Sequence, residues 1–154
     1  KQYVGRYEVS PENSNPYLWT TEKTHAASSL FELGNFNRQI LLDFLPLHEE
    51  WFGEPLIPSF TYGYRVYNPG AYLYGHTDQI PTHIVGSSLC VQSQLDRPWI
   101  FSMENKEGKE ALLSLEPGQM CFYESAFLEH GRPIPLRGQY YVGMFLHYRP
   151  KSED

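Results

Sequence analysis

Two side chains that can bind a metal ion stand two positions apart in this sequence, His76 and Asp78. Residues i and i+2 of a β-strand point to the same face, so this imidazole and this carboxylate can reach one ion from one side of a sheet. His130, which follows a predicted strand, is the expected third ligand. Two histidines and one carboxylate form the facial triad that holds non-haem Fe(II) and leaves open positions for substrates. His76, Asp78 and His130 are therefore candidate metal ligands.

The residues that position these ligands have the pattern of short β-strands from Ile57 onward. Aromatic and apolar side chains occupy every second position between residues 59 and 67, and Asn68-Pro69-Gly70 is a strong turn signal. About seven or eight strand candidates follow one another, separated by turns and by a charged loop at residues 104–110. Short strands separated by turns predict a mainly β fold, either a sandwich or an open barrel, whose core spans residues 57–150.

The first third of the chain is expected to support this core. Residues 1–25 are polar and rich in Asn, Pro, Ser and Thr, which predicts an extended arm. Residues 35–52 carry apolar side chains at helical spacing and predict a supporting helix. Pro46 is expected to kink this segment or to divide it into two helices. Residues 1–154 are thus expected to form a single domain.

The composition argues against several classes of function. The chain of 154 residues has a net charge of −6, so it has no basic footprint for nucleic acid or an anionic membrane. No uncharged stretch is long enough to span a membrane. No G-x-S-x-G, P-loop or dinucleotide fingerprint occurs, which argues against hydrolases, NTPases and dehydrogenases. The lack of a signal-peptide pattern favours a cytoplasmic location, although a leader removed earlier would leave no trace here.

Three segments surround the expected metal ligands: residues 67–78 (YNPGAYLYGHTD), residues 115–123 (LEPGQMCFY), and residues 130–141, which contain HGRP and LRGQYY. In their order and approximate spacing they resemble the 2-oxoglutarate/Fe(II)-dependent oxygenase superfamily, and within it the prolyl 4-hydroxylase-like group. The resemblance covers about residues 62–150. It implies a double-stranded β-helix (jelly roll) preceded by one or two supporting helices. It also implies that the triad binds Fe(II), with 2-oxoglutarate and O₂ as cosubstrates.

The activity implied by this resemblance is hydroxylation of an amino-acid side chain in a peptide or protein, with proline as the first candidate. The net charge of −6 favours neutral or basic peptides. Two alternatives stay open. One is a cupin-like metalloenzyme that does not use 2-oxoglutarate, and the other is a catalytically inactive jelly-roll binding module.

One position departs from the family pattern and bears on the cosubstrate. The family usually has an Arg or Lys about ten residues after the distal histidine to pair with the far carboxylate of 2-oxoglutarate, whereas this sequence has Tyr140. A buried carboxylate needs a cation or several donors, so Arg132, then Arg65, then Arg137 are the expected substitutes. The expected cosubstrate-binding residues are Arg132, Arg65, Arg137, Tyr140, Tyr67, Tyr72 and Tyr74.

The alternation of side chains along a regular strand predicts which residues near the triad share its face. This alternation puts Tyr72 and Tyr74 on the face of His76, where they would line the cosubstrate pocket. The family often has a tyrosine where this chain has Leu73. By the same alternation His83 is expected on the opposite face and His147 at an outward position, so neither histidine is expected in the site.

Overall fold

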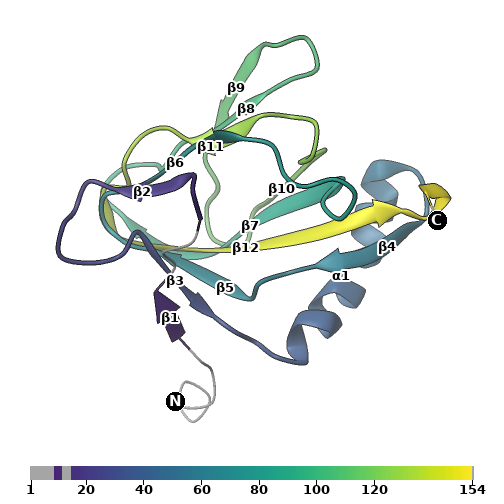
Figure 1. The fold of residues 1–154 in the computed structure, drawn as a ribbon, viewed down its shortest axis with the longest axis horizontal. Helices are drawn as coiled ribbons and strands as arrows, with labels where there is room; N and C mark the ends of the chain where they lie inside the picture. Colours follow the sequence, from purple (N-terminus) through teal and green to yellow (C-terminus); the bar gives the residue numbers. More distant parts are fainter. Residues whose placement is uncertain (1–8, 12–14, 154) are drawn as a thin grey trace.

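The computed structural model describes residues 9–11 and 15–153, and these residues form two antiparallel β-sheets that face each other (Figure 1). The larger sheet has the order β1-β3-β5-β12-β7-β10, with β4 also paired to β12, and the smaller has the order β2-β6-β11-β8-β9. The strands of the larger sheet are β1 (Val9–Pro11), β3 (Ser28–Phe31), β4 (Leu56–Phe60), β5 (Tyr64–Tyr67), β7 (Val85–Leu95), β10 (Met120–Tyr123) and β12 (Gly138–Pro150). Those of the smaller sheet are β2 (Leu18–Thr20), β6 (Ala71–His76), β8 (Phe101–Glu104), β9 (Glu110–Leu113) and β11 (His130–Arg132).

The predicted mainly β jelly roll is confirmed. One buried cluster, which includes Leu73 from the smaller sheet and Tyr67 and Tyr141 from the larger, fills the space between the sheets. Trp99, which precedes β8, completes this cluster with its ring 5.2 Å from that of Tyr141. Aromatic side chains bury large areas each, so a chain rich in Tyr, Phe and Trp can form a core between two small sheets.

Strand β12 divides its side chains between the two cores of the protein. Tyr141 and Phe145 belong to the cluster between the sheets. Met144, Leu146 and Tyr148 belong to a second cluster on the opposite face of the larger sheet. Because successive residues of a strand point to opposite faces, odd-numbered positions of β12 face the space between the sheets.

The second cluster is covered by one helix, α1 (Phe36–Phe52), which confirms the predicted supporting helix. The helix continues through Pro46, so the expected division into two helices is wrong. It ends where Gly53 adopts a left-handed conformation (φ 87°) and donates a hydrogen bond to the carbonyl of Glu49. Buried polar contacts attach α1 to the sheet, since the Tyr148 hydroxyl donates to the carbonyl of Leu41 at 2.8 Å.

The expected N-terminal arm contributes strands rather than a free extension. Strand β1 pairs with β3, and β2 pairs with β6, where Trp19 lies opposite Tyr72. Residues 1–8 and 12–14 of the arm lie outside the described residues. The described helix α1 is too short and too polar to cross a membrane. A single domain over the whole chain stays a prediction.

The last helical turn of the chain is the short 3₁₀ helix η2 (Lys151–Glu153), which follows β12 directly. The Lys151 backbone N–H donates to the carbonyl of Pro55 at 2.9 Å, next to the start of β4. This contact holds the C-terminal end of β12 beside β4, which pairs with β12 near α1 (Figure 1).

Candidate metal centre and adjoining cavity

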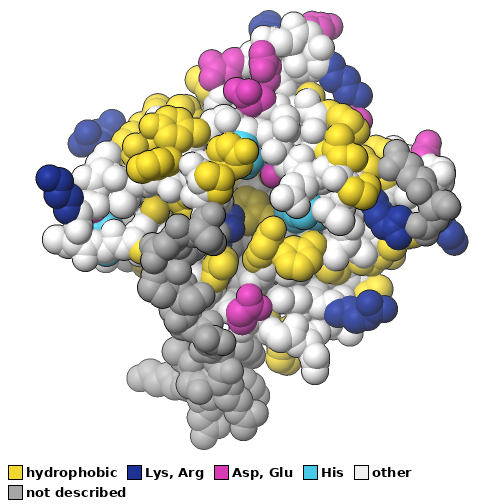
Figure 2. Space-filling model, viewed as in Figure 1, with side chains coloured by type: hydrophobic (Ala, Val, Ile, Leu, Met, Phe, Trp, Pro, Cys, Tyr) yellow, Lys and Arg dark blue, Asp and Glu magenta, His cyan; other side chains and the backbone are white. Residues whose placement is uncertain are grey.

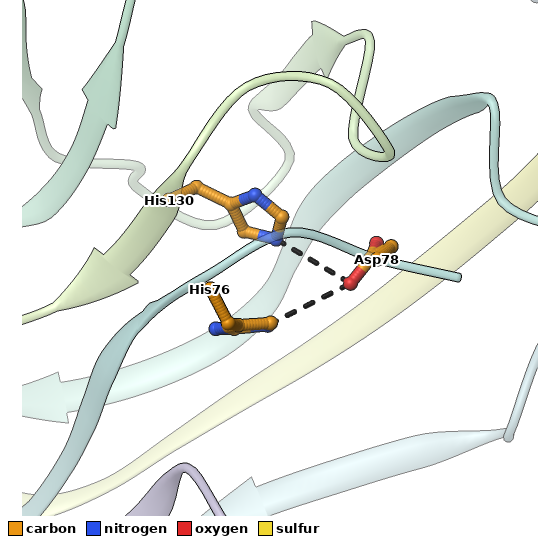
Figure 3. Close-up of side chains that lie close together, drawn as sticks. All are labelled: His76, Asp78 and His130. Carbon is orange, nitrogen blue, oxygen red and sulfur yellow. Dashed lines mark ion pairs between the residues drawn. The ribbon is translucent and has the colours of Figure 1, made fainter. Parts of the chain in front are cut away.

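The two histidines predicted as metal ligands lie opposite each other in the smaller sheet. His76 is the last residue of β6 and His130 is the first of β11, and the two pair across the antiparallel ladder. Asp78 lies two residues beyond the end of β6, where its backbone N–H donates to the carbonyl of Ser125 at 2.8 Å. The pairing of two strand ends and this loop contact bring the three side chains to one point (Figure 3).

The three side chains have the geometry of a metal site. Oδ1 of Asp78 lies 3.6 Å from Nε2 of His76 and 3.6 Å from Nε2 of His130. The potential ligand atoms of the three residues all lie within 4.8 Å of one another. Two imidazoles and one carboxylate on one side of a central point suit a divalent first-row metal such as Fe(II). The residues present therefore fit the metal that the sequence implies.

Backbone carbonyl groups orient both imidazole rings. Nδ1 of His76 lies 2.9 Å from the carbonyl oxygen of Tyr74, and Nδ1 of His130 lies 2.8 Å from that of Leu128. A carbonyl only accepts, so each Nδ1 must carry the proton and donate it. The neutral ring then keeps the lone pair of Nε2 free for a metal ion. These two contacts set the tautomer that metal binding requires.

Burial and neighbouring charges shift the pKa values of the ligands in directions that suit a metal. Burial raises the pKa of Asp78, but the close imidazole of His130, with smaller contributions from His147 and His76, outweighs burial and lowers this pKa to about 2. Burial, followed by the charge of His130, lowers the pKa of His76 below its ordinary value. An ionised carboxylate and a neutral imidazole are therefore favoured at neutral pH, and these are the forms that bind metals.

A cavity of about 110 Å³ lies beside the triad, between the two sheets. Its lining includes all three triad side chains, aromatic rings such as those of Phe101 and Tyr123, and two arginines. Arg65 comes from β5 in the larger sheet, and Arg132 comes from β11 in the smaller sheet. The cavity thus combines a candidate metal site with cationic groups and an apolar wall.

Arg132, the first-ranked arginine, is buried in this cavity and only 1% exposed. Its guanidinium carbon lies 4.2 Å from the ring centre of Trp99 and 4.5 Å from that of Tyr141. Nη1 donates to the carbonyl of Trp99 at 2.9 Å, whereas the buried Nη2 makes no hydrogen bond of standard geometry within the described residues. A buried guanidinium with an unused donor beside a cavity is suited to a carboxylate.

Two further predicted cosubstrate residues line the same cavity. The Arg65 guanidinium carbon packs over the rings of Tyr62, at 5.6 Å, and Phe145, at 5.3 Å. Tyr67 is fully buried, and its hydroxyl has no hydrogen-bond partner within the described part of the chain. Arg65 is thus a second cation near the triad, and Tyr67 offers a neutral hydroxyl.

Arg137 and Tyr140 lie outside the cavity. Arg137 is exposed in the segment before β12, and its backbone carbonyl accepts a hydrogen bond from the N–H of Asp96. Tyr140 occupies an even-numbered position of β12, whereas Tyr141 belongs to the core between the sheets. The position about ten residues after His130 therefore supplies no group to the cavity.

Tyr72 and Tyr74 do not share the face of the metal ligands, so that prediction is wrong. Leu73 lines the cavity instead, whereas the two tyrosines line a groove of about 420 Å³ on the outer surface of the smaller sheet. The reason is a β-bulge. Leu73 and His76 are three residues apart in β6, but they pair with Arg132 and His130, which are only two residues apart in β11. The extra residue in β6 reverses the alternation between Leu73 and His76.

Two histidines expected elsewhere also line the cavity, His83 and His147. Their rings lie 4.0 Å apart, and Nδ1 of His147 lies 3.8 Å from Oδ2 of Asp78. His83 lies in the loop before β7, so counting along a regular strand does not apply to it. His147 is at an odd-numbered position of β12, in phase with Tyr141 and Phe145, and that phase was the signal in the sequence that could have placed it inside.

Comparison with known proteins supports the fold. No protein-family model and no curated protein matches the chain. Among solved structures, it is similar to a prolyl-4-hydroxylase from Pseudomonas putida, with a TM-score of 0.60 and 15% identity over 97% of this chain and 81% of that one. It is also similar to AviO1 from Streptomyces viridochromogenes Tue57, with a TM-score of 0.58 and 11% identity over 92% of this chain and 76% of that one. The chain therefore shares the fold of this prolyl-4-hydroxylase and of AviO1.

Proposed function

We propose that this protein is an Fe(II)- and 2-oxoglutarate-dependent dioxygenase that hydroxylates an amino-acid side chain, with proline as the first candidate, in a peptide or protein. The observation that carries the proposal is the convergence of His76, Asp78 and His130 beside a cavity that holds the buried Arg132. The similarity of fold to a prolyl-4-hydroxylase supports it. Bound Fe(II), with 2-oxoglutarate and O₂, would supply the oxidising power that inserts a hydroxyl group into a C–H bond.

The protein's own contribution to this chemistry is to hold and orient the reactants. His76, Asp78 and His130 would bind the metal from one side, so the opposite positions stay open for the cosubstrates. The hydrogen bonds from the two Nδ1 atoms to backbone carbonyls keep the rings aimed at the metal. Metal affinity then depends on a preformed site rather than on rearrangement of the ligands.

Arg132 is the proposed partner for the far carboxylate of 2-oxoglutarate. Its guanidinium is fixed by the rings of Trp99 and Tyr141, and its buried Nη2 can donate to a carboxylate oxygen. Removing a carboxylate from water is unfavourable unless a cation replaces the lost hydrogen bonds. Arg65 is the second candidate, and the unpaired Tyr67 hydroxyl would add a neutral hydrogen bond.

The proposed cosubstrate cavity also restricts access of water to the metal. The rings of Phe101 and Tyr123 lie 5.6 Å apart and cover the side of the cavity next to His130. Apolar walls of this kind lower the local dielectric constant, which strengthens the interaction between Arg132 and a carboxylate. They also protect a reactive site from side reactions with solvent.

The proposed substrate is a peptide with a basic side chain near the modified residue. The outer groove, defined by Tyr72, Tyr74, Glu104, Glu110 and Glu129, contains no lysine or arginine in its lining. Within the described residues, none of its three carboxylates forms an ion pair with a cation. Figure 2 shows acidic side chains at the base of the β8–β9 hairpin, beside hydrophobic ones over β2 and β6.

The outer groove and the inner cavity share two lining residues. These are Leu73 of β6 and His130 of β11. The groove also carries exposed aromatic surface, since Tyr74 is 53% exposed and its ring lies 5.4 Å from that of Tyr72. Aromatic faces and carboxylates together favour a lysine or arginine side chain.

The decisive test is anaerobic addition of 2-oxoglutarate to the Fe(II)-loaded protein. Chelation of the metal by the cosubstrate is expected to produce a visible charge-transfer band. Succinate release is then measured with a panel of peptides that differ in proline content and in charge. A colourless mixture with no tighter iron binding would favour a cupin-like metalloenzyme, and metal binding without turnover would favour a binding module.

A further inference from the structure

We propose that His147 is a positioning residue that holds Oδ2 of Asp78, so that Asp78 binds the metal through Oδ1 alone. This inference rests on the proposed metal centre and concerns a residue outside the triad. Its direct observation is the separation of 3.8 Å between Nδ1 of His147 and Oδ2 of Asp78. The same carboxylate has its other oxygen, Oδ1, 3.6 Å from each triad imidazole.

The two oxygens of Asp78 thus face different partners. Oδ1 points into the triad, and Oδ2 points toward β12, where His147 lies on the strand's inner face. Asp78 itself lies outside a strand, so no ladder fixes the direction of its side chain. A carboxylate without a second contact can rotate and offer both oxygens to a metal, which would occupy one of the positions that the cosubstrates need.

His147 has a ring nitrogen that can donate to Oδ2 of Asp78 when the proton of the neutral imidazole is on Nδ1. The side chain is buried, with 4% exposure, and Nδ1 has no hydrogen-bond partner within the described residues. A buried polar group without a partner is unfavourable, because it has lost its hydrogen bonds to water. The present separation exceeds an N–H···O hydrogen bond by only about 1 Å, so a small movement of either side chain would complete the contact.

Gly86, Ser125 and His83 lie around His147. Gly86 pairs with His147 across the sheet, and a Cβ at Gly86 would lie 3.4 Å from Nδ1 of His147 and 2.6 Å from Oγ of Ser125. Ser125 in turn accepts the backbone N–H of Asp78 and donates its hydroxyl to the carbonyl of His83. The ring of His83 covers that of His147 at 4.0 Å.

The consequence is a defined mode of metal binding. An outer contact that orients a ligating carboxylate typically changes metal affinity by about 10–100-fold when it is removed. If His147 holds Oδ2, its loss weakens metal binding and also changes the number of protein oxygens on the metal. If His147 only fills space, its substitution would leave the absorption spectrum of the bound metal unchanged. The effect of a substitution would then not depend on whether the new side chain has a donor at the position of Nδ1.

Two amide substitutions separate these roles. His147→Asn places an N–H donor close to the position of Nδ1, whereas His147→Gln places its donor close to the position of Nε2. Both are polar and smaller than or similar to histidine, so their effects on folding are comparable. Binding of Co(II) to the apo protein is measured by titration calorimetry and by visible absorption, with thermal unfolding as the check on folding.

We expect His147→Asn to bind Co(II) within about threefold of the unmodified protein with the same absorption spectrum, and His147→Gln to bind about 10–100-fold more weakly with an altered spectrum. Equal affinities and spectra for the two variants would overturn the positioning role while leaving the metal centre intact. Failure of the unmodified protein to bind Co(II) would instead overturn the metal centre itself, and the positioning role with it.

Discussion

The guanidinium group of Arg132 lies against the indole ring of Trp99, 4.2 Å from its centre, and donates a hydrogen bond to the backbone carbonyl of the same residue. The indole N–H of Trp99 donates in turn to the carbonyl of Ile134 at 2.8 Å. These reciprocal contacts tie β11 to the segment before β8. They hold a permanently charged group inside the core, which is unfavourable unless it serves a buried anion or is otherwise compensated.

Replacing Arg132 by leucine is expected to weaken 2-oxoglutarate binding by at least about 30-fold. Truncating one partner of a buried charged hydrogen bond is unfavourable by about 2–5 kcal/mol, and about 1.4 kcal/mol corresponds to a tenfold change in affinity. The measurement is anaerobic titration of the Fe(II) protein with 2-oxoglutarate, followed by the charge-transfer band. Arg137→Leu, at an exposed site outside the cavity, is the matched control and is expected to bind normally.

The same titration of Arg65→Leu distinguishes the two cavity arginines. If Arg132→Leu binds 2-oxoglutarate normally and Arg65→Leu binds it more weakly, then Arg65 and not Arg132 binds the far carboxylate. Thermal unfolding of each variant is required beside the titration, because Arg132 is buried and its removal is also expected to lower stability.

His130→Ala is expected to abolish metal binding and iron-dependent activity and to leave the fold intact. The two hydrophobic clusters carry most of the stability. His130 adds a hydrogen bond to the carbonyl of Leu128, worth about 1 kcal/mol, and packing of its buried ring against Tyr123. For a chain of this length, the hydrogen bond alone corresponds to a fall in Tm of about 2–4 °C, and the lost packing adds to it. Calorimetry and circular dichroism of the metal-free variant check both parts. Unfolding of the metal-free protein would point instead to a structural ion.

The strands and the triad were predictable because short-range patterns encode them. Alternation and turn residues located the strands, and the supporting helix was predicted to begin at residue 35 and is observed from Phe36. The spacing of His76 and Asp78 predicted that their side chains lie close together, although the reason was partly wrong. Asp78 reaches the triad through a loop anchored on Ser125, not through the strand that carries His76.

The face of the sheet to which residues near the site point could not be predicted, because it depends on bulges in the strands. The bulge in β6 turns Tyr72 and Tyr74 outward. The residue types in β6 do not predict this bulge, which is seen only in the pairing of β6 with β11. At Pro46 the sequence predicted an interruption that the structure does not have. A proline inside a helix is usually disruptive, but α1 is held by its buried contacts with the sheet and continues through it.

Stability is expected to fall as the pH is lowered from neutrality. Burial, the largest contribution, lowers the pKa of His147 to about 3, whereas an imidazole in the unfolded chain has a pKa of about 6.5. Between these values the unfolded state binds more protons, so the contribution is fully present above about pH 6.5 and is lost toward pH 3, by up to about 1.4 kcal/mol per pH unit. Asp78, with its pKa lowered to about 2, adds a further loss below about pH 4.

Urea unfolding followed by tryptophan fluorescence at about pH 7 and about pH 5 measures this dependence. His147→Asn lacks the titrating group and is the control, so its free energy of unfolding is expected to change less over the same interval. A variant as sensitive to pH as the unmodified protein would mean that other groups dominate the response.

Reversing the charge of the outer groove is expected to weaken binding of a basic peptide. The combined substitutions Glu104→Lys, Glu110→Lys and Glu129→Lys remove three carboxylates from the groove and leave the triad unchanged. Each exposed ion pair is worth about 0.2–1 kcal/mol, so a peptide that contacts all three is expected to lose about 3- to 150-fold in affinity. Fluorescence anisotropy with a labelled proline-containing lysine-rich peptide measures it without requiring turnover.

The matched control for the groove carries the same change in net charge at exposed glutamates elsewhere, Glu32, Glu54 and Glu116. If the groove binds the peptide, the control retains its affinity within about threefold, because charges farther away than about 10 Å are largely screened at about 0.1 M salt. Equal losses in both triple variants would mean that only the overall charge attracts the peptide. Since the assay needs neither metal nor cosubstrate, its result is independent of whether Arg132 binds 2-oxoglutarate.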